Sequence, residues 1–286
     1  MRVIAPASPF PRADFERGVA RLRERYTVEL DPSIFDADGY LAGGDARRLD
    51  ELRRALTDGG VDAVVAARGG YGATRLLDGI APEEVRPRLL VGFSDLTALH
   101  ALFARAGLRS LHATMVAGLG RGTDAALAGW IAAAEGAVPA PLDGLTPIAP
   151  GRAEGPLAGG NLAVLAALCG TPYAPPLEGA VFFLEDVGEA PYRIDRMLTT
   201  LRQAGWLRRL AGVAVGQLTR ATPGPDGRTV EEVLRDRLGD LGVPVVRGVP
   251  AGHDEDNRPL PLGAPVELDA DAGTLTFREA AAVAHG

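Results

Sequence analysis

Short apolar runs alternate along the chain with longer stretches in which apolar residues recur at helical spacing. In the first half, the runs predict buried strands at residues 3–5, 26–30, 61–67, 89–93 and 108–115. The helical spacing predicts helices at residues 14–25, 45–56, 74–77 and 94–105. Strands that alternate with helices in this way indicate a parallel sheet with right-handed crossovers.

The second half shows a similar alternation. Apolar runs predict strands at residues 180–184, 212–218 and 243–249, and helical spacing predicts helices at residues 162–168, 192–201 and 229–238. The last of these helices is rich in acids and arginines, so we expect it to face solvent. Two short β-like segments, 266–268 and 274–277, are joined through Asp271-Ala272-Gly273 and predict a hairpin.

Between the two halves the composition changes, because prolines are interspersed with glycine and alanine from about residue 122 to 159. We interpret residues 137–155 as a linker between domains. This interpretation divides the chain into an N-terminal domain, residues 1–136, and a C-terminal domain, residues 156–286.

The most informative stretch is the strand, tight turn and helix of residues 89–105. The turn reads Gly92-Phe93-Ser94-Asp95, which is the setting of a nucleophile elbow that lifts a serine hydroxyl above a sheet. Two features count against this reading. Leu96 replaces the second glycine of the usual G-x-S-x-G pattern, and Ser-Asp before a helix is also an ordinary N-cap arrangement. From these residues alone, catalysis and capping both stay open.

Two glycine-rich stretches also follow predicted strands. Arg68-Gly69-Gly70-Tyr71-Gly72 allows positive φ angles and a close approach of backbone to a ligand. It matches neither a dinucleotide-binding nor a Walker pattern, and a simple tight turn is the alternative. We interpret the other stretch, Gly155 to Asn161, as the start of the second domain.

Glu185 and His253 are candidate partners of Ser94. Glu185 comes directly after four apolar strand residues, where an open sheet presents its ligands, although an isolated acid of this kind is more often a helix-entry or surface residue. His253 follows a predicted strand and Gly252, and histidine is the usual general base for a serine. The three residues could form a nucleophile, base and orienting acid whatever their order in the chain.

The other three histidines are weaker candidates. His100 falls on a predicted helix, His112 lies near a strand end where it could line a pocket, and His285 is set aside at the end of the chain.

Composition narrows the function classes. The net charge of −7 and the pI near 5.2 argue against nucleic acid as a main partner. Lysine is absent, which excludes a lysine base, a lysine Schiff base and a P-loop lysine. The single cysteine, Cys169, forms no internal disulfide and no cysteine metal site. The acidic loop at residues 254–256 lacks EF-hand spacing, so no metal is expected. No secretory signal or membrane-spanning run is apparent, so we expect a cytoplasmic protein.

Five motifs in order resemble those of the LD-carboxypeptidases, the S66 family of serine peptidases. The motifs are Arg68-Gly69-Gly70-Tyr71-Gly72, Gly92-Phe93-Ser94-Asp95-Leu96-Thr97, Gly159-Gly160-Asn161-Leu162, Leu184-Glu185-Asp186 with Pro191 to Leu198, and Gly252-His253 with Leu260 to Gly263. They cover nearly the whole chain. One departure is Phe93, where the family commonly has tyrosine.

The resemblance implies an N-terminal parallel-sheet α/β domain of flavodoxin or Rossmann type and a smaller, β-rich α/β C-terminal domain, usually in a homodimer. It also implies a cytoplasmic hydrolase of peptidoglycan recycling that removes D-alanine from murein tetrapeptides, without cofactor or metal. By the motif match, Ser94 is the nucleophile, His253 the base and Glu185 its orienting partner, although Asp186 could orient the base chemically.

The mechanism that this set of residues supports also needs groups that bind the substrate. We expect backbone N–H groups of Asp95, Gly69 and Gly70 to stabilise an oxyanion. Arg68 is a candidate for the substrate carboxylate, or it braces the turn.

Three alternatives stay open at this stage. The first is an amidase of the microcin immunity branch, which cleaves peptidyl-nucleotide conjugates. The second is an inactive protein that binds small molecules on the same fold. The third is an unrelated esterase of the α/β-hydrolase type, which the other four motifs disfavour.

Overall fold

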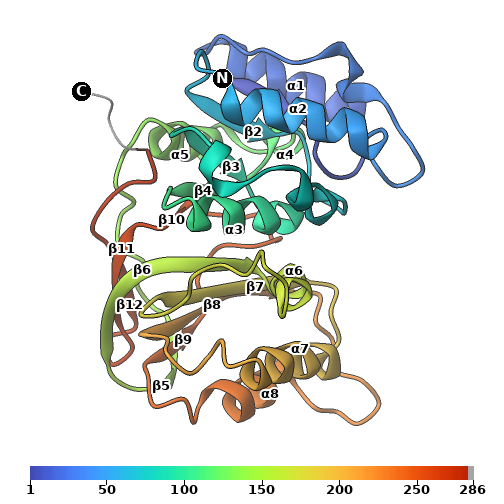
Figure 1. Ribbon diagram of the computed structural model, residues 1–286. Helices are drawn as coiled ribbons and strands as arrows, with labels where there is room; N and C mark the ends of the chain where they lie inside the picture. Colours follow the sequence, from blue (N-terminus) through green and yellow to red (C-terminus); the bar gives the residue numbers. More distant parts are fainter. Residues whose placement is uncertain (283–286) are drawn as a thin grey trace.

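The computed structural model describes residues 1–282, whose strands form two separate sheets (Figure 1). The first sheet has the order β1-β2-β3-β4-β10. Its strands are β1 (Arg2–Ile4), β2 (Ala63–Ala66), β3 (Leu89–Gly92), β4 (Ser110–His112) and β10 (Leu260–Leu262). The first four are parallel, and β10 pairs antiparallel with β4. A strand from the far end of the sequence therefore completes the N-terminal sheet.

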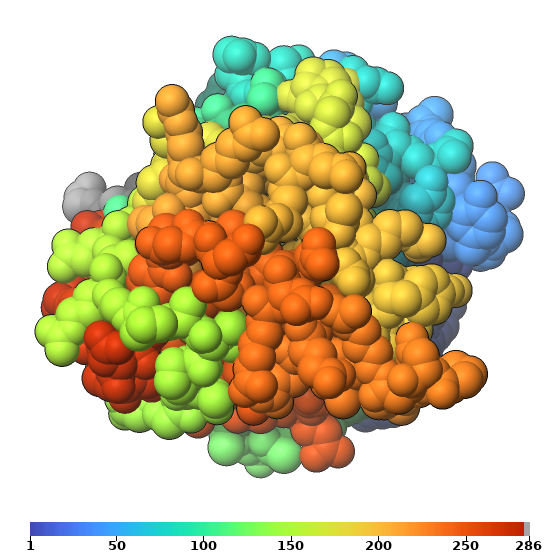
Figure 2. Space-filling model, turned by 90° about the horizontal axis from the view of Figure 1, so that it is seen from below, coloured from blue at the N-terminus to red at the C-terminus, as the bar shows by residue number. Residues whose placement is uncertain are grey.

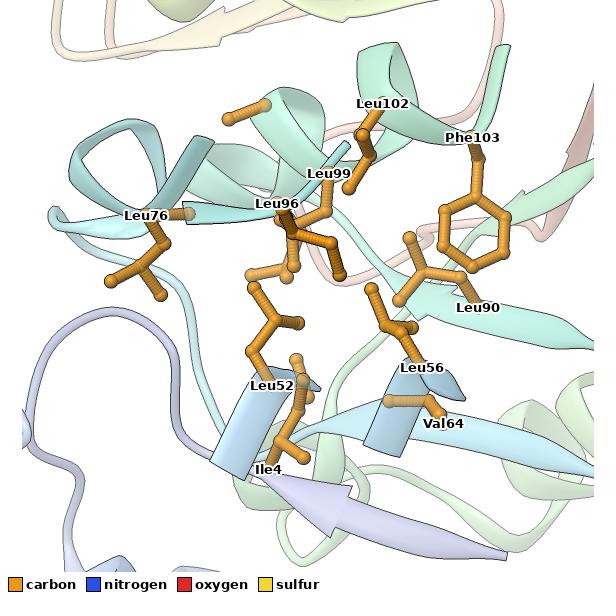
Figure 3. Close-up of a cluster of buried hydrophobic side chains, with 14 of the residues drawn as sticks. Ile4, Leu52, Leu56, Val64, Leu76, Leu90, Leu96, Leu99, Leu102 and Phe103 are labelled. Carbon is orange, nitrogen blue, oxygen red and sulfur yellow. The ribbon is translucent and has the colours of Figure 1, made fainter. Parts of the chain in front are cut away.

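Helices cover both faces of this sheet. They are α1 (Arg12–Arg23), α2 (Asp45–Thr57), α3 (Thr97–Arg105), α4 (Val116–Leu119) and α5 (Asp124–Ala134), with 3₁₀ turns η1 (Pro32–Phe35), η2 (Ala73–Gly79), η3 (Pro82–Glu84) and η4 (Ser94–Leu96). On one face, apolar residues of α2, η2 and α3 pack on the strands, as Figure 3 shows for Leu52, Leu90 and Leu99. On the other face, α1, α4 and α5 contribute a second buried cluster. Because both faces are covered, the strands read as continuous apolar runs.

The second sheet has seven strands in the order β12-β11-β6-β7-β8-β9-β5. They are β5 (Thr146–Ala149), β6 (Arg152–Asn161), β7 (Val181–Val187), β8 (Gly212–Thr219), β9 (Val245–Arg247), β11 (Pro265–Asp269) and β12 (Thr274–Phe277). Strands β6 to β9 are parallel, whereas β5, β11 and β12 pair antiparallel.

Three helices belong to the second sheet: α6 (Leu162–Leu168), α7 (Pro191–Gln203) and α8 (Val230–Leu238). Their apolar faces pack with one face of β6 to β9. Figure 2 views the molecule from the end that carries α7 and α8, and these segments cover much of that face. Helix α3 lies between the two sheets, where it contacts both β6 and α6 (Figure 1).

The prediction of two α/β parts is confirmed, but several elements differ from the expectation. Residues 26–30 form no strand, because only Glu29 bridges to Arg2. Helix α5 and strand β10 were not predicted. Strand β5 and the start of β6 lie inside the segment 137–155 that was interpreted as a linker, so much of that segment belongs to the second sheet.

Within residues 1–282, no helix has both the length and the apolar character needed to cross a membrane.

Candidate active site

Ser94 lies two residues after the end of β3, at the start of η4, with a φ angle of 62°. A non-glycine residue in the left-handed region is uncommon and marks a backbone held by its surroundings. Gly92 leaves room for this turn, since a Cβ there would lie 2.8 Å from Cγ of Leu96. Leu96 is fully buried in the core below the turn. The elbow geometry is therefore present, with a packed leucine where the usual pattern has glycine.

Ser94, His253 and Glu185 form a continuous chain of side-chain contacts. His253 Nδ1 lies 2.7 Å from Glu185 Oε2, and His253 Nε2 lies 3.1 Å from Ser94 Oγ. A carboxylate can only accept, so Nδ1 carries the ring proton and Nε2 can accept the proton of the serine hydroxyl. The contacts join residues 159 and 68 positions apart in the sequence.

The acid of this set lies in the interior, whereas the serine and the histidine reach the surface. Glu185 lies in β7 and is fully buried, whereas 17% of the His253 side chain is exposed. The second carboxylate oxygen, Oε1, has no hydrogen-bond partner among the described residues. The histidine ring is therefore the one hydrogen-bond partner of this carboxylate among the described residues.

The loop that carries His253 is held by two amide side chains. Gln217 of β8 accepts from Asp254 N–H at 2.9 Å and donates to the Asp256 carbonyl at 2.7 Å. Asn257 accepts from Gly252 N–H at 3.0 Å. Gly252 itself has a φ of 146°, and a Cβ there would lie 2.9 Å from that of Gln217. These contacts fix the direction in which the histidine leaves the sheet.

The glycine loop of residues 68–72 lies against the serine. A Cβ on Gly69 would lie 3.3 Å from Ser94 Oγ, so only glycine allows this approach without displacement. The N–H groups of Gly69, Gly70 and Asp95 donate no hydrogen bond to another residue in the described part of the chain. They are free to bind an oxyanion. Arg68 is exposed, and its Nη1 donates to the Pro9 carbonyl at 2.6 Å, as the bracing alternative requires.

The Asp95 side chain turns away from the serine into the interior. Its carboxylate accepts from Ala73 N–H at 2.8 Å and is almost fully buried. Burial raises its pKa to about 6, against the lowering effect of that hydrogen bond and of the Arg48 charge. Asp95 therefore joins the elbow to the end of the glycine loop.

The motif Gly159-Gly160-Asn161 docks the second sheet onto the elbow helix. Asn161 N–H donates to Thr97 Oγ1 at 2.9 Å, and a Cβ on Gly160 would lie 2.5 Å from the same atom. Asp186 accepts from the Asn161 side chain at 3.2 Å and from Ala163 N–H at 2.9 Å. Its pKa is raised to about 6 by burial. Asp186 thus supports α6 and has no hydrogen bond to a histidine of the described residues, which leaves Glu185 as the acid beside His253.

The other two described histidines, His100 and His112, do not reach the serine. His100 Nε2 donates to the Gly92 carbonyl at 2.9 Å, so its Nδ1 accepts from Ser110 Oγ at 2.7 Å. Burial lowers its pKa to about 4. His112 is also fully buried, with its ring against Phe93 and Phe183 rather than lining an open pocket.

Two further residues named from the sequence remain to be placed. His285 lies outside the described residues. Cys169 follows α6, is half-buried and packs beside the core of the second sheet.

Several residues around the site were missed from the sequence. Thr97 and Asn161 stand inside quoted motifs, yet nothing local indicates that they meet. Gln217 is a polar residue near the end of an apolar strand, which was a usable signal for a functional edge. Arg48 sits on a charged amphipathic helix, where arginine is normally exposed. Within residues 1–282, no group of three or more metal-ligating side chains is gathered that could hold an ion.

A serine on a strained turn, a histidine and a buried acid between two α/β sheets have the arrangement of the serine hydrolases. The chain belongs to the LD-carboxypeptidase family. The family's N-terminal domain matches residues 1–113 and its C-terminal domain matches residues 154–268. The protein is thus a serine-type carboxypeptidase, a hydrolase of peptide bonds, and the resemblance drawn from the sequence motifs is confirmed.

Relatives span the whole chain. A putative carboxypeptidase of Streptomyces coelicolor is 44% identical over 99% of this chain and 94% of its own length. The murein tetrapeptide carboxypeptidase of Pseudomonas aeruginosa is 33% identical over 94% of this chain and 92% of its own.

Solved structures share the fold. The muramoyltetrapeptide carboxypeptidase of Oxalobacter formigenes has a TM-score of 0.85 and 29% identity, and the match covers 98% of this chain and 99% of that one. A microcin C7 self-immunity protein has a TM-score of 0.86 at 20% identity, with 96% and 94% covered, which shows a common fold only.

Proposed function

We propose that this carboxypeptidase hydrolyses the bond that precedes the terminal D-alanine of a murein tetrapeptide, with Ser94 as nucleophile, His253 as general base and Glu185 as its orienting acid. The observation that carries the proposal is the 3.1 Å approach of His253 Nε2 to Ser94 Oγ, with Nδ1 held by a buried carboxylate. The relatives named for murein peptides support the substrate class.

In the proposed mechanism, His253 Nε2 takes the hydroxyl proton as Ser94 Oγ attacks the carbonyl carbon of the L-centre. The tetrahedral intermediate collapses when His253 returns the proton to the leaving amine, so D-alanine departs and an acyl-serine remains. A water molecule then repeats the sequence, with His253 as base, and releases the tripeptide. Buried Glu185 stabilises the imidazolium that forms in each half of the reaction.

The negative oxygen of the intermediate needs donors, and the free N–H groups of Gly69, Gly70 and Asp95 are our candidates. One such donor accounts for about 3–4 kcal/mol of the barrier in other serine hydrolases. Arg68 remains our candidate for the substrate carboxylate, because its guanidinium is exposed and, among the described residues, only its Nη1 has a hydrogen-bond partner.

The test is D-alanine release from a murein tetrapeptide by the wild-type chain and by Ser94→Ala. We expect release by the wild type and a loss of roughly three orders of magnitude or more in the variant. Ser33→Ala, in the remote turn η1, is the matched serine control and should keep full activity. In the same assay, Arg68→Met should raise KM and leave kcat nearly unchanged; an unaltered KM would remove Arg68 from substrate binding.

Equal release of D-alanine by wild type and Ser94→Ala would contradict a catalytic role for Ser94 and favour the alternative that it only caps a helix. No release by folded wild type would contradict the murein proposal, and a panel of peptidyl-nucleotide conjugates would then test the immunity-type amidase. Absence of Ser94 labelling by a fluorophosphonate would favour an inactive binding protein.

We also propose that the enzyme acts in the cytoplasm as a homodimer. The lone cysteine is consistent with a reducing compartment. Light scattering coupled to size-exclusion chromatography tests the dimer, and a monomer at micromolar concentration would contradict it.

A further inference from the structure

We propose that the side chains of Arg48 and Asp95 form a clamp on the peptide group between Gly72 and Ala73, and that this clamp positions the glycine loop of residues 69–72 against Ser94. The inference rests on the proposed function, because it concerns the oxyanion donors of the same site. Arg48 and Asp95 are positioning residues, since their side chains act through the loop.

Arg48 projects from α2 and is fully buried, which is rare for arginine. Its Nη1 donates to the carbonyls of Gly72 at 2.9 Å and Pro6 at 2.5 Å, and its Nε donates to that of Gly43 at 3.2 Å. The guanidinium also pairs with Asp45 at the start of α2. A buried charge is tolerated only when its hydrogen bonds are made, so these backbone carbonyls are held in place.

Asp95 contacts the other side of the same peptide group. Its carboxylate accepts from Ala73 N–H at 2.8 Å, while Arg48 donates to the Gly72 carbonyl. A single peptide plane therefore lies between a buried cation and a buried anion. Asp95 is also the residue after Ser94, so the anion that holds the loop is covalently joined to the nucleophile.

The loop is too tightly packed to absorb a shift of this peptide. A Cβ on Gly72 would lie 2.5 Å from Arg48 Nη1, one on Gly70 would lie 2.5 Å from Cβ of Ser8, and one on Gly69 would lie 3.1 Å from that of Ser94. The N–H of Tyr71 is held by Ser8 Oγ at 3.1 Å. A displacement at residue 72 is therefore passed on to the free N–H groups of Gly69 and Gly70.

Loss of the clamp should slow chemistry more than binding. For Arg48→Met and Asp95→Ala we expect kcat to fall roughly 10- to 100-fold, because misplaced donors stabilise the transition state less, with KM changed by less than about threefold. Asp95→Asn keeps an acceptor for Ala73 N–H and should retain more activity than Asp95→Ala. This rescue separates the hydrogen bond from the bulk of the side chain.

Arg88 supplies the matched control. It is also a buried arginine, and it donates to the carbonyls of Ala55 and Asp58 at 2.7 and 2.8 Å, away from the glycine loop. Arg88→Met removes the same chemical group and creates similar unpaired carbonyls. It should lower stability as Arg48→Met does and leave kcat close to that of the wild type.

The experiment measures kcat and KM for D-alanine release together with the rate of Ser94 labelling by a fluorophosphonate, for wild type and all four variants. The clamp is supported if labelling is slow and kcat is low in Arg48→Met and Asp95→Ala, while Arg88→Met keeps rates close to those of the wild type. Wild-type rates in both, or an equal fall in Arg88→Met, overturn it. If Arg48→Met does not fold, the comparison of Asp95→Ala with Asp95→Asn decides. Labelling needs no murein substrate, so the clamp is tested even if the substrate proposal fails.

Discussion

His112 occupies the space between the two sheets with its ring centroid 5.6 Å from that of Phe93 and 5.1 Å from that of Phe183. Both ring nitrogens lack a hydrogen-bond partner among the described residues. Complete burial, with His100 and His253 nearby, holds its pKa well below the usual value. The ring is therefore neutral, and it packs as an aromatic side chain that sets the position of Phe93, which in turn lies 4.8 Å from the His253 ring.

A leucine at this position should stabilise the protein. His112→Leu removes two unpaired polar atoms, so we expect the free energy of unfolding to rise by about 1–3 kcal/mol at pH 7.5. The folded pKa of His112 lies below the unfolded value of about 6.5, so the wild type loses stability as pH falls through 6.5 and the variant does not lose this part. The difference in the free energy of unfolding between His112→Leu and the wild type should therefore be larger at pH 5 than at pH 7.5, as measured by urea unfolding.

His100→Leu is the control for this prediction. It breaks the hydrogen bonds to Gly92 and Ser110, so it should destabilise at pH 7.5. The raised pKa values of Asp95 and Asp186, about 6, make stability change with pH in the opposite direction. Both residues are present in the wild type and in the variant, so their contributions cancel when the two free energies of unfolding are subtracted. A gap for His112→Leu that does not change with pH would contradict the assignment of a neutral, unpaired ring.

At the scale of elements, local sequence patterns account for most helices. Helix α6 has the bounds predicted for it, and α8 begins with a capping box in which Thr229 Oγ1 accepts from Glu232 N–H while the Glu232 carboxylate accepts from Thr229 N–H. The strand prediction at residues 26–30 was wrong. Alternating apolar residues suit the side chains of a strand, but a strand also needs a neighbouring strand for its backbone hydrogen bonds. This segment bridges to β1 only at Glu29, which pairs with Arg2.

Removal of the α8 cap should affect stability and leave catalysis unchanged. Thr229→Ala leaves helix N–H groups unpaired, so we expect it to lower the free energy of unfolding by about 1 kcal/mol. Thr229→Ser keeps the hydroxyl and should retain most of the wild-type stability. Because α8 lies on the outer side of the second sheet (Figure 2), kcat and KM for D-alanine release should match the wild type. Thermal unfolding checks the first expectation; an equal loss in Thr229→Ser would show that the hydroxyl does not cap.

At the scale of the whole molecule, the two sheets are interlocked. Strand β10 follows β9 of the second sheet in the sequence yet pairs with β4 of the first. Helix α3 packs against β6 and α6, and Asn161 bonds to Thr97 at its start. The site lies at this junction, since Ser94 comes from the first sheet and Glu185 from the second. Separation of the halves would therefore break the contacts that join Ser94, His253 and Glu185.

This interlocking predicts one cooperative unfolding transition. The two tryptophans report on different places, because Trp130 is buried beside the first sheet, whereas Trp206 packs against the core of the second sheet and also against the cluster of α2, η2 and α3 on the first. In Trp130→Phe and Trp206→Phe, the remaining tryptophan should report a urea midpoint that coincides with the far-ultraviolet circular dichroism midpoint of the same variant. Separate midpoints within either variant would contradict a single unit.

The sequence by itself determined the alternation of strands and helices, the elbow at residues 92–95, the glycine loop, the acid near the end of a strand and the histidine in a loop after one. These features depend on backbone preferences and on apolar spacing within a dozen residues, which every segment carries locally. The resemblance of five motifs then implied which of these residues belong together.

Only the tertiary structure decided which distant groups meet. Three features depend on such meetings: the burial of Arg48, the hydrogen bonds of Gln217 to the histidine loop and the pairing of β10 with β4. They join residues 24 to 152 positions apart, counted from Arg48 to Gly72, from Gln217 to Asp256 and from Ser110 to Leu262. No local pattern encodes them, because their stability comes from burial and hydrogen bonds that exist only after the two sheets have packed. The physical reason is that a side chain's environment, unlike its spacing, is a property of the folded chain.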